Sequence, residues 1–188
     1  MAQAKTLTQA ELDQVLRYVS TRKFPERNRA IVLTSFWSGL RVGEIASLKM
    51  GDVINEDGTI KAEIRLSAEQ TKGSQPRTVF LPTKLRAELA NYFATRYAQL
   101  PELPFFNTHR RLGFTANGLC VWFFAMYHGA GISGASSHSG RRNFITTLAN
   151  KGISVRVLAS LAGHKSIAVT QKYIDTNDDM KRNAVELI

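Results

Sequence analysis

Cysteine is nearly absent from this sequence: Cys120 is the only one among 188 residues, so disulfide bonds have no part in the fold. The longest apolar runs, such as residues 119–127, fall well short of the ~20 residues that a membrane span needs. The N-terminal stretch lacks the apolar segment of a secretory signal. These absences favour a reducing, cytoplasmic setting and no membrane partner.

The motifs of nucleotide and metal chemistry are also missing. The sequence contains no GxxxxGK[ST] loop, no HExxH pair and no obvious cluster of carboxylates that could hold catalytic magnesium. We therefore expect no cofactor and no metal, and a metal-dependent nuclease is disfavoured.

Acidic residues are scarce relative to basic ones. The 15 Asp and Glu face 25 Lys and Arg, which gives a formal net charge of +10 and a sequence pI near 10.0. Such an excess favours a polyanionic partner, nucleic acid above all, although a merely solvated basic surface would look the same in composition. An anionic membrane surface fits less well, because the basic residues are spread along the chain.

The remaining composition is that of an ordinary globular protein, with 44% hydrophobic and 21% charged residues and no biased tract. We expect one domain over residues 1–188, with residues 1–7 flexible. A capping box, in which Thr8 caps and Glu11 sits three residues on, opens the first helical pattern. Helices are expected over residues 8–18, 26–37, 41–48, 83–97, 117–128, 139–150, 155–162 and 167–174, with a short tail helix over 178–188.

Between the helices, the pattern changes to that of a small antiparallel sheet. Alternation from Ile60 to Leu66 predicts one strand and residues 78–81 predict a second, with the polar stretch 70–77 turning the chain between them. Residues 101–113 read as a basic loop. The expected fold class is α+β: mostly helical, with one small sheet near the N-terminal third.

Four segments carry a set of cationic and imidazole side chains, and the last of them also carries a tyrosine near the C-terminus. They are SGLRVGEIASLKMGDV around Arg41, TKGSQPR with Lys72, HSGRRNF with His138 and Arg141, and LAGHKSIAVTQKYI with His164 and Tyr173. In this order the segments resemble the tyrosine recombinase, or phage integrase, family over nearly the whole chain from residue 7 to 173. The conjunction is what makes the resemblance specific, because each residue type alone is common.

The resemblance implies a DNA-breaking and rejoining enzyme that needs neither metal nor ATP. Tyr173 would attack the phosphodiester and form a 3′-phosphotyrosine. Arg41 and Arg141 would clamp the phosphate, since each guanidinium offers paired N–H donors to the charge that builds on its oxygens. Glu44 is expected to support Arg41 structurally.

The same resemblance assigns the proton transfers. His138 is the best candidate for the general base that accepts the phenol proton, because a free phenol with a pKa of about 10 is mostly protonated at neutral pH. Lys72 on the hairpin would protonate the departing 5′ oxygen, and His164 would hydrogen-bond and orient the phosphate.

Each of these catalytic assignments has a plainer structural alternative. Arg41 could simply pair with Glu44 across one helical turn, Tyr173 could close the core, and a loop lysine such as Lys72 is usually just solvated.

The sequence departs from the family pattern at Gly140, where relatives usually carry a larger apolar residue, so the junction before Arg141 is expected to be looser. Candidate DNA-backbone contacts, which a solvated basic face explains nearly as well, are Arg110, Arg111, Arg142, Lys165 and Lys172.

Three functions remain open at this stage: a site-specific recombinase, a type IB topoisomerase-like relaxing enzyme, and a DNA-binding module without catalysis. We expect double-stranded DNA as partner, a monomer in solution and a tetramer on DNA. Most family members carry a further N-terminal domain, so the chain is either a naturally short recombinase, like the fimbrial phase-switching ones, or a fragment. The apolar tail 178–188 is expected either to pack on its own domain or to be exchanged between subunits.

Overall fold

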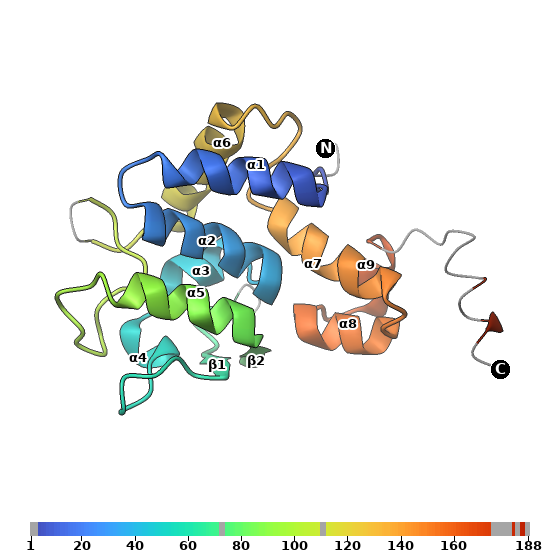
Figure 1. The fold of residues 1–188 in the computed structure, drawn as a ribbon. Coiled ribbons are helices and arrows are strands. Elements are labelled where there is room, and N and C mark those ends of the chain that lie inside the picture. Colours follow the sequence, from blue (N-terminus) through green and yellow to red (C-terminus); the bar gives the residue numbers. More distant parts are fainter. Residues whose placement is uncertain (1–3, 72–73, 110–111, 174–181, 183–184, 187–188) are drawn as a thin grey trace.

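The computed structural model describes residues 4–71, 74–109, 112–173, 182 and 185–186. Within these ranges the chain folds into helices and one small sheet (Figure 1). The helices are α1 (Gln9–Ser20), α2 (Pro25–Ser38), α3 (Val42–Ser47), α4 (Met50–Val53), α5 (Thr83–Phe93), α6 (Ala116–Gly129), α7 (Ser139–Asn150), α8 (Val155–Ala162) and α9 (Ile167–Gln171). The strands β1 (Glu63–Leu66) and β2 (Arg77–Phe80) pair antiparallel, with Ile64 opposite Val79. The expected α+β class is confirmed.

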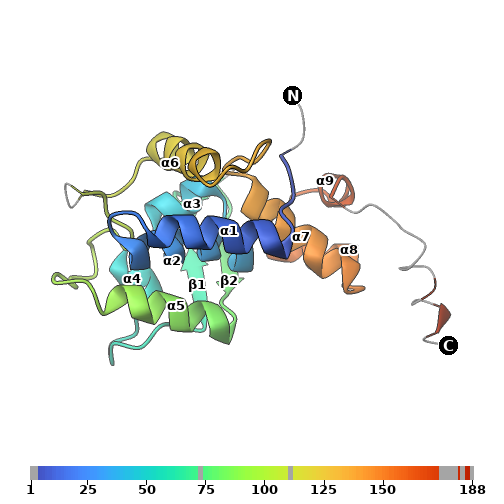
Figure 2. The same cartoon turned by 45° about the horizontal axis from the view of Figure 1, so that its top comes forward.

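Helix α2 forms the centre of the core. Its residues from Ala30 to Leu33 are fully buried, because α1, α5 and α7 all pack against it. Helices α1 and α5 flank α2 in both views, as Figure 1 and Figure 2 show. The buried residues of α2 also include polar ones, such as Asn28, Thr34 and Ser35, so this helix is enclosed on several sides at once.

The helices α7, α8 and α9 form a second region beside this core, drawn in orange in Figure 1. Helix α7 packs on α2, α8 packs on α7 and α9, and α8 also contacts strand β2. The junction between the two regions therefore brings together residues that are far apart in the sequence.

The expected capping box is confirmed at the start of α1. Thr8 Oγ1 accepts from the backbone N–H of Glu11 at 3.2 Å, and the Glu11 carboxylate accepts from the backbone N–H of Thr8 at 3.0 Å. The pair satisfies two backbone donors that the first helical turn leaves unpaired.

Helix α4 was not expected, because four residues are too few to show a helical period. Helix α5 ends at Phe93 rather than at residue 97, because the N–H groups of Thr95 and Arg96 donate to the carbonyls of Tyr92 and Phe93, three residues back, and no longer follow the four-residue step. The expected basic loop, residues 101–113, also contributes Phe105 and Phe106 to the core.

The described part of the N-terminal segment is tied to α7. The Asn143 amide group pairs with both the N–H and the carbonyl of Leu7 at 2.7 Å, and Leu7 is buried. The Lys5 N–H donates to the Gly134 carbonyl at 3.1 Å. Of the expected tail helix over 178–188, most lies outside the described residues; Glu186 N–H donates to the Arg182 carbonyl, as in a helical turn.

The junction before Arg141 is tight, not loose. A Cβ at Gly140 would lie 2.2 Å from Ser35 Oγ and 2.9 Å from a ring carbon of Phe36, so α7 approaches α2 more closely there than any larger residue allows. The glycine costs helix propensity but permits this packing. The expectation of looseness, based on propensity alone, was wrong.

Candidate active site

Arg41 sits at the start of helix α3, held by a buried carboxylate. Glu44 is 1% exposed; its Oε2 accepts from the Arg41 backbone N–H at 2.7 Å and its Oε1 accepts from Arg41 Nη1 at 3.0 Å. A third donor, Arg41 Nη2, reaches the Gly163 carbonyl at 3.2 Å. Glu44 thus contacts Arg41 in the way expected of a supporting residue, while part of the guanidinium stays accessible.

A second arginine, Arg77 on β2, binds the same carboxylate and was missed by sequence reasoning. Its Nη2 and Nε donate to Glu44 at 2.7 and 3.3 Å, and its Nη1 donates to the Leu161 carbonyl at 2.9 Å. The sequence did contain a signal for Arg77. Val79 and Leu81 are buried, and Arg77 lies two and four residues before them, so in extended chain its side chain points to the same face. A charged residue on the buried face of a strand needs a buried partner.

Arg141 lies on α7, almost completely buried. Nη1 donates to the Gly39 carbonyl at 2.6 Å, and Nη2 contacts the Ala162 carbonyl and, at 2.9 Å, His164 Nε2. Burial, reinforced by the positive charges of Arg41 and Arg77, lowers the pKa of Arg141 to about 9. The Arg141 guanidinium is thus shielded from water and lies near two other positive charges, and a bound anion would relieve the repulsion among them.

His164 is neutral and held in one tautomer. Because a guanidinium can only donate, Nε2 must accept from Arg141, and Nδ1 therefore carries the proton and donates to Thr170 Oγ1 at 2.8 Å. Burial, together with the charges of Arg141, Arg41 and Arg77, lowers the pKa of His164 to about 4. In this arrangement His164 orients Arg141 directly.

The turn at Gly163 connects these groups. Gly163 ends α8 with φ of 61°, a conformation that favours glycine, and its carbonyl accepts from Arg41. A Cβ at this position would lie 2.6 Å from Cδ of Arg77. Two arginines from the first half of the chain therefore lie directly against this turn.

Tyr173 follows α9 and lies beside the same cluster. Its ring stacks on His164 with centroids 5.7 Å apart, and the Arg142 guanidinium lies 5.7 Å from its ring centroid. The Tyr173 carbonyl accepts from Thr146 Oγ1 at 3.3 Å. The partly buried ring of Tyr173 thus lies between one cation, Arg142, and the neutral His164.

The structure thus brings together four of the six expected catalytic residues: Arg41, Arg141, His164 and Tyr173. His138 is exposed at the N-terminal end of α7, three residues before Arg141. Lys72 lies outside the described residues, as do Arg110 and Arg111; Lys165 and Lys172 are exposed.

A cavity of about 320 Å³ opens beside this cluster. Arg41, Arg77 and His164 line one part, and Thr71 and Gln75, which flank the hairpin position of Lys72, line another. A cavity walled by cations and bordered by the hairpin suits a phosphate group.

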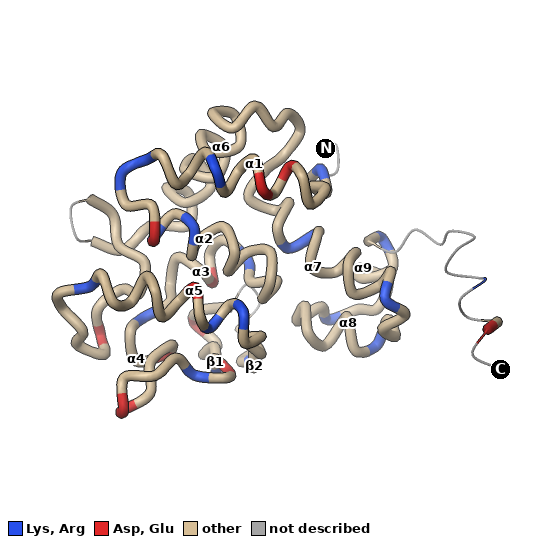
Figure 3. Tube along the Cα trace, in the orientation of Figure 1, with Lys and Arg blue, Asp and Glu red and all other residues tan. Residues whose placement is uncertain are grey.

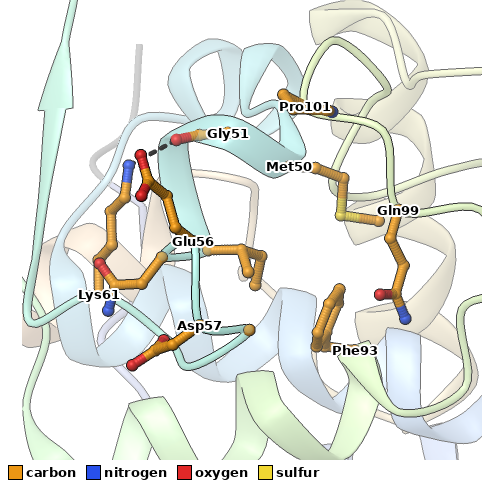
Figure 4. Close-up of a pocket in the computed structure, with 11 residues that line it drawn as sticks. Met50, Gly51, Glu56, Asp57, Lys61, Phe93, Gln99 and Pro101 are labelled. Atoms are coloured by element: carbon orange, nitrogen blue, oxygen red, sulfur yellow. Dashed lines mark hydrogen bonds between the residues drawn. The ribbon is translucent and has the colours of Figure 1, made fainter.

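A larger cavity, about 790 Å³, lies between α4 and α5 but has different chemistry (Figure 4). Lys61 already donates to the Gly51 carbonyl there, and Glu56 and Asp57 add negative charge. The glycine run Gly129–Gly134 has the GxGxxG spacing, yet it follows helix α6 instead of a strand, so it lacks the context of a dinucleotide loop. Neither feature competes with the cationic cluster.

Charge is distributed unevenly over the fold. No Asp or Glu occurs between Glu102 and Asp175, so α6 to α9 contain basic residues without acidic ones. Figure 3 shows this for α7, α8 and α9.

In the described ranges, no three His, Cys, Asp or Glu side chains gather closely enough to hold a metal ion. In those ranges, too, no helix is long and apolar enough to span a bilayer.

The fold is that of the tyrosine recombinases. A crystal structure of XerA recombinase matches with a TM-score of 0.78 at 24% identity, covering 100% of this chain and 66% of that chain. The Tn1549 transposon integrase in complex with a circular intermediate DNA matches with a TM-score of 0.75 at 18% identity, covering 100% of this chain and 67% of that one.

The chain belongs to the phage integrase family, whose model matches residues 5–180. Curated relatives include tyrosine recombinase XerA of Pyrococcus furiosus, 32% identical over 97% of this chain and 61% of the relative. Tyrosine recombinase XerC of Lactobacillus delbrueckii subsp. bulgaricus is 30% identical over 95% of this chain and 60% of its own length. The chain spans about three fifths of these relatives, and neither a topoisomerase nor a binding-only module is favoured by the matches.

Proposed function

We propose that this chain is the catalytic domain of a site-specific DNA recombinase that cuts and rejoins DNA through a 3′-phosphotyrosine at Tyr173. The observation that carries the proposal is the convergence of Arg41, Arg141 and Tyr173 around one neutral histidine, His164. The names of the relatives, which are recombinases, support the reaction class.

The chemistry needs no group beyond the chain and its substrate. The Tyr173 phenolic oxygen attacks phosphorus, the bond to the 5′ oxygen breaks, and that oxygen leaves with a proton. Arg41 and Arg141 stabilise the charge on the non-bridging oxygens, and His164 keeps the Arg141 guanidinium oriented. His138 accepts the phenol proton and Lys72 protonates the leaving oxygen, and attack by another 5′ hydroxyl reverses the step.

Double-stranded DNA is the proposed partner. The stretch from α6 to Tyr173 carries basic residues and no acidic ones, and Arg142 lies over the Tyr173 ring. Arg110, Arg111, Arg142, Lys165 and Lys172 are proposed backbone contacts. Affinity that rests on phosphate contacts falls steeply with salt. We expect the isolated chain to bind DNA weakly as a monomer, and four copies to assemble on DNA, with the tail 178–188 packing on its own or a neighbouring subunit.

The test is covalent trapping on a nicked suicide substrate that carries the junction of the element encoding this chain. The wild-type chain should form a protein–DNA adduct, and Tyr173→Phe should bind the same DNA without forming one. Tyr97→Phe is the matched control, because Tyr97 is fully exposed and away from the cluster; it should form the adduct normally. Binding without any adduct would contradict the proposal, and relaxation of plasmids that lack the junction would favour a topoisomerase.

A further inference from the structure

The Glu44 carboxylate is shared between two arginines. Its Oε1 accepts from Arg41 Nη1 at 3.0 Å and from Arg77 Nε at 3.3 Å, and its Oε2 accepts from the Arg41 backbone N–H and from Arg77 Nη2, both at 2.7 Å. All four hydrogen bonds form at a residue with 1% exposure. The carboxylate is therefore saturated with donors.

The sharing decides how much positive charge is left for a substrate. Two arginines and one glutamate carry a net charge of +1, whereas Arg41 and Glu44 alone would form a neutral pair. Without Arg77, Oε2 would lose its side-chain donor and could attract a second N–H of Arg41 into a two-pronged pair. Burial works to raise the pKa of Glu44, but the hydrogen bonds and charges of Arg77 and Arg41 outweigh it and lower that pKa overall, so the carboxylate stays ionised.

Arg77 also connects the two regions of the fold. It starts strand β2, donates to the Leu161 carbonyl of α8 at 2.9 Å, and passes under the Gly163 turn. It lies five residues after Lys72 in the same hairpin segment. The side chain thus fastens the strand that leaves the hairpin to both α3 and α8.

We propose that Arg77 is a positioning residue of the recombination reaction: by taking a share of the Glu44 carboxylate, it leaves Arg41 turned toward the scissile phosphate. The proposal rests on the proposed function. Arg77 acts through Glu44 and Arg41, and its contribution lies in the cleavage step more than in DNA binding.

The first measurement is the rate of adduct formation at saturating protein. Arg77→Gln should lower it by roughly 100-fold, the usual scale for losing one preorganised donor, while DNA affinity changes less than about 3-fold. Arg77→Lys keeps the charge but not the planar fork, and should fall between Arg77→Gln and wild type. Arg65→Gln is the matched control: it removes an arginine from the neighbouring strand whose side chain is 84% exposed, and should cleave normally.

A second substrate separates positioning from loss of structure. A methylphosphonate at the scissile position removes the charge of one non-bridging oxygen, so cleavage of it depends less on the arginine clamp. The defect of Arg77→Gln relative to wild type should shrink at least about 10-fold on this substrate, as should the defect of Arg41→Ala. A protein that is only partly folded would lose the same factor on both substrates.

The route through Glu44 has its own test. If a freed carboxylate captures Arg41, then Glu44→Gln should restore part of the cleavage rate lost in Arg77→Gln, because a neutral amide attracts the guanidinium less. Wild-type cleavage by Arg77→Gln, equal defects on both substrates, or no recovery in the double variant would each overturn the inference. Failure of the wild-type chain to form any adduct would instead count against the proposed function.

Discussion

Gly163→Ala should destabilise the protein by more than its backbone conformation alone explains. The residue has φ of 61°, and placing a non-glycine residue in that region costs about 1–2 kcal/mol. The new Cβ would also lie 2.6 Å from Arg77 Cδ, so Arg77 must shift. Its hydrogen bonds to Glu44 and Leu161 involve a charged group, and weakening them costs a further ~1.5 kcal/mol or more.

Gly152→Ala is the control that measures the cost of the backbone conformation alone. Gly152 has φ of 80°, and no atom lies within 4 Å of where its Cβ would be. It should therefore lose only about 1–2 kcal/mol, against roughly 3 kcal/mol for Gly163→Ala. For a chain of this length each kcal/mol corresponds to about 2–4 °C, so the melting temperatures of the two variants should differ by roughly 3–6 °C.

Thermal and urea unfolding followed by circular dichroism measure this difference, and adduct formation supplies a second readout. Gly163→Ala should also cleave slowly, because the Gly163 carbonyl accepts from Arg41 and the displaced Arg77 shares the Glu44 carboxylate. Gly152→Ala should cleave as fast as wild type once folded. Equal melting temperatures for the two variants would refute the claim that Arg77 is packed rigidly beneath the turn.

Three further predictions concern single contacts. Thr170→Val removes the acceptor of His164 Nδ1 at constant size; unfolding titrations should show a loss of about 1–2 kcal/mol, and trapping assays a slower cleavage step. The free energy of unfolding should fall as pH drops from about 6.5 to 4, because the unfolded chain binds a proton there that folded His164, with its pKa lowered to about 4, does not; a pH series on His164→Gln should be shallower. Thr8→Ala should lower the melting temperature by roughly 2–4 °C through loss of the cap, with cleavage unchanged.

Local chemistry explains why most helices could be predicted. The capping box at Thr8 and the glycine after α8 mark helix ends through interactions within a few residues, and apolar periodicity marks the faces. Helix α4 is too short to show a period, and α5 gives way to three-residue turns at Thr95 and Arg96, a change that apolar spacing does not reveal.

The candidate site also contains residues that the sequence could predict and one that it could not. The resemblance supplied the identities of Arg41, Arg141, His164 and Tyr173, whose side chains do converge. It did not supply Arg77, whose side chain binds a carboxylate 33 residues earlier in the sequence. The roles of His138 and Lys72 stay predictions. Helix propensity gave the wrong expectation of a loose junction at Gly140, because the close approach of Ser35 depends on tertiary packing.

The hydrogen bond from Arg41 to the Gly163 carbonyl joins residues that are 122 positions apart. Such a contact closes a long loop, which costs chain entropy, and the ribosome releases Arg41 well before His164 and Tyr173. A chain that stops before α8 therefore still carries Arg41 but lacks the Gly163 carbonyl that Arg41 contacts, and also lacks His164 and Tyr173. Under the proposed function, such a shortened chain should form no covalent adduct with DNA, even where its basic residues allow it to bind.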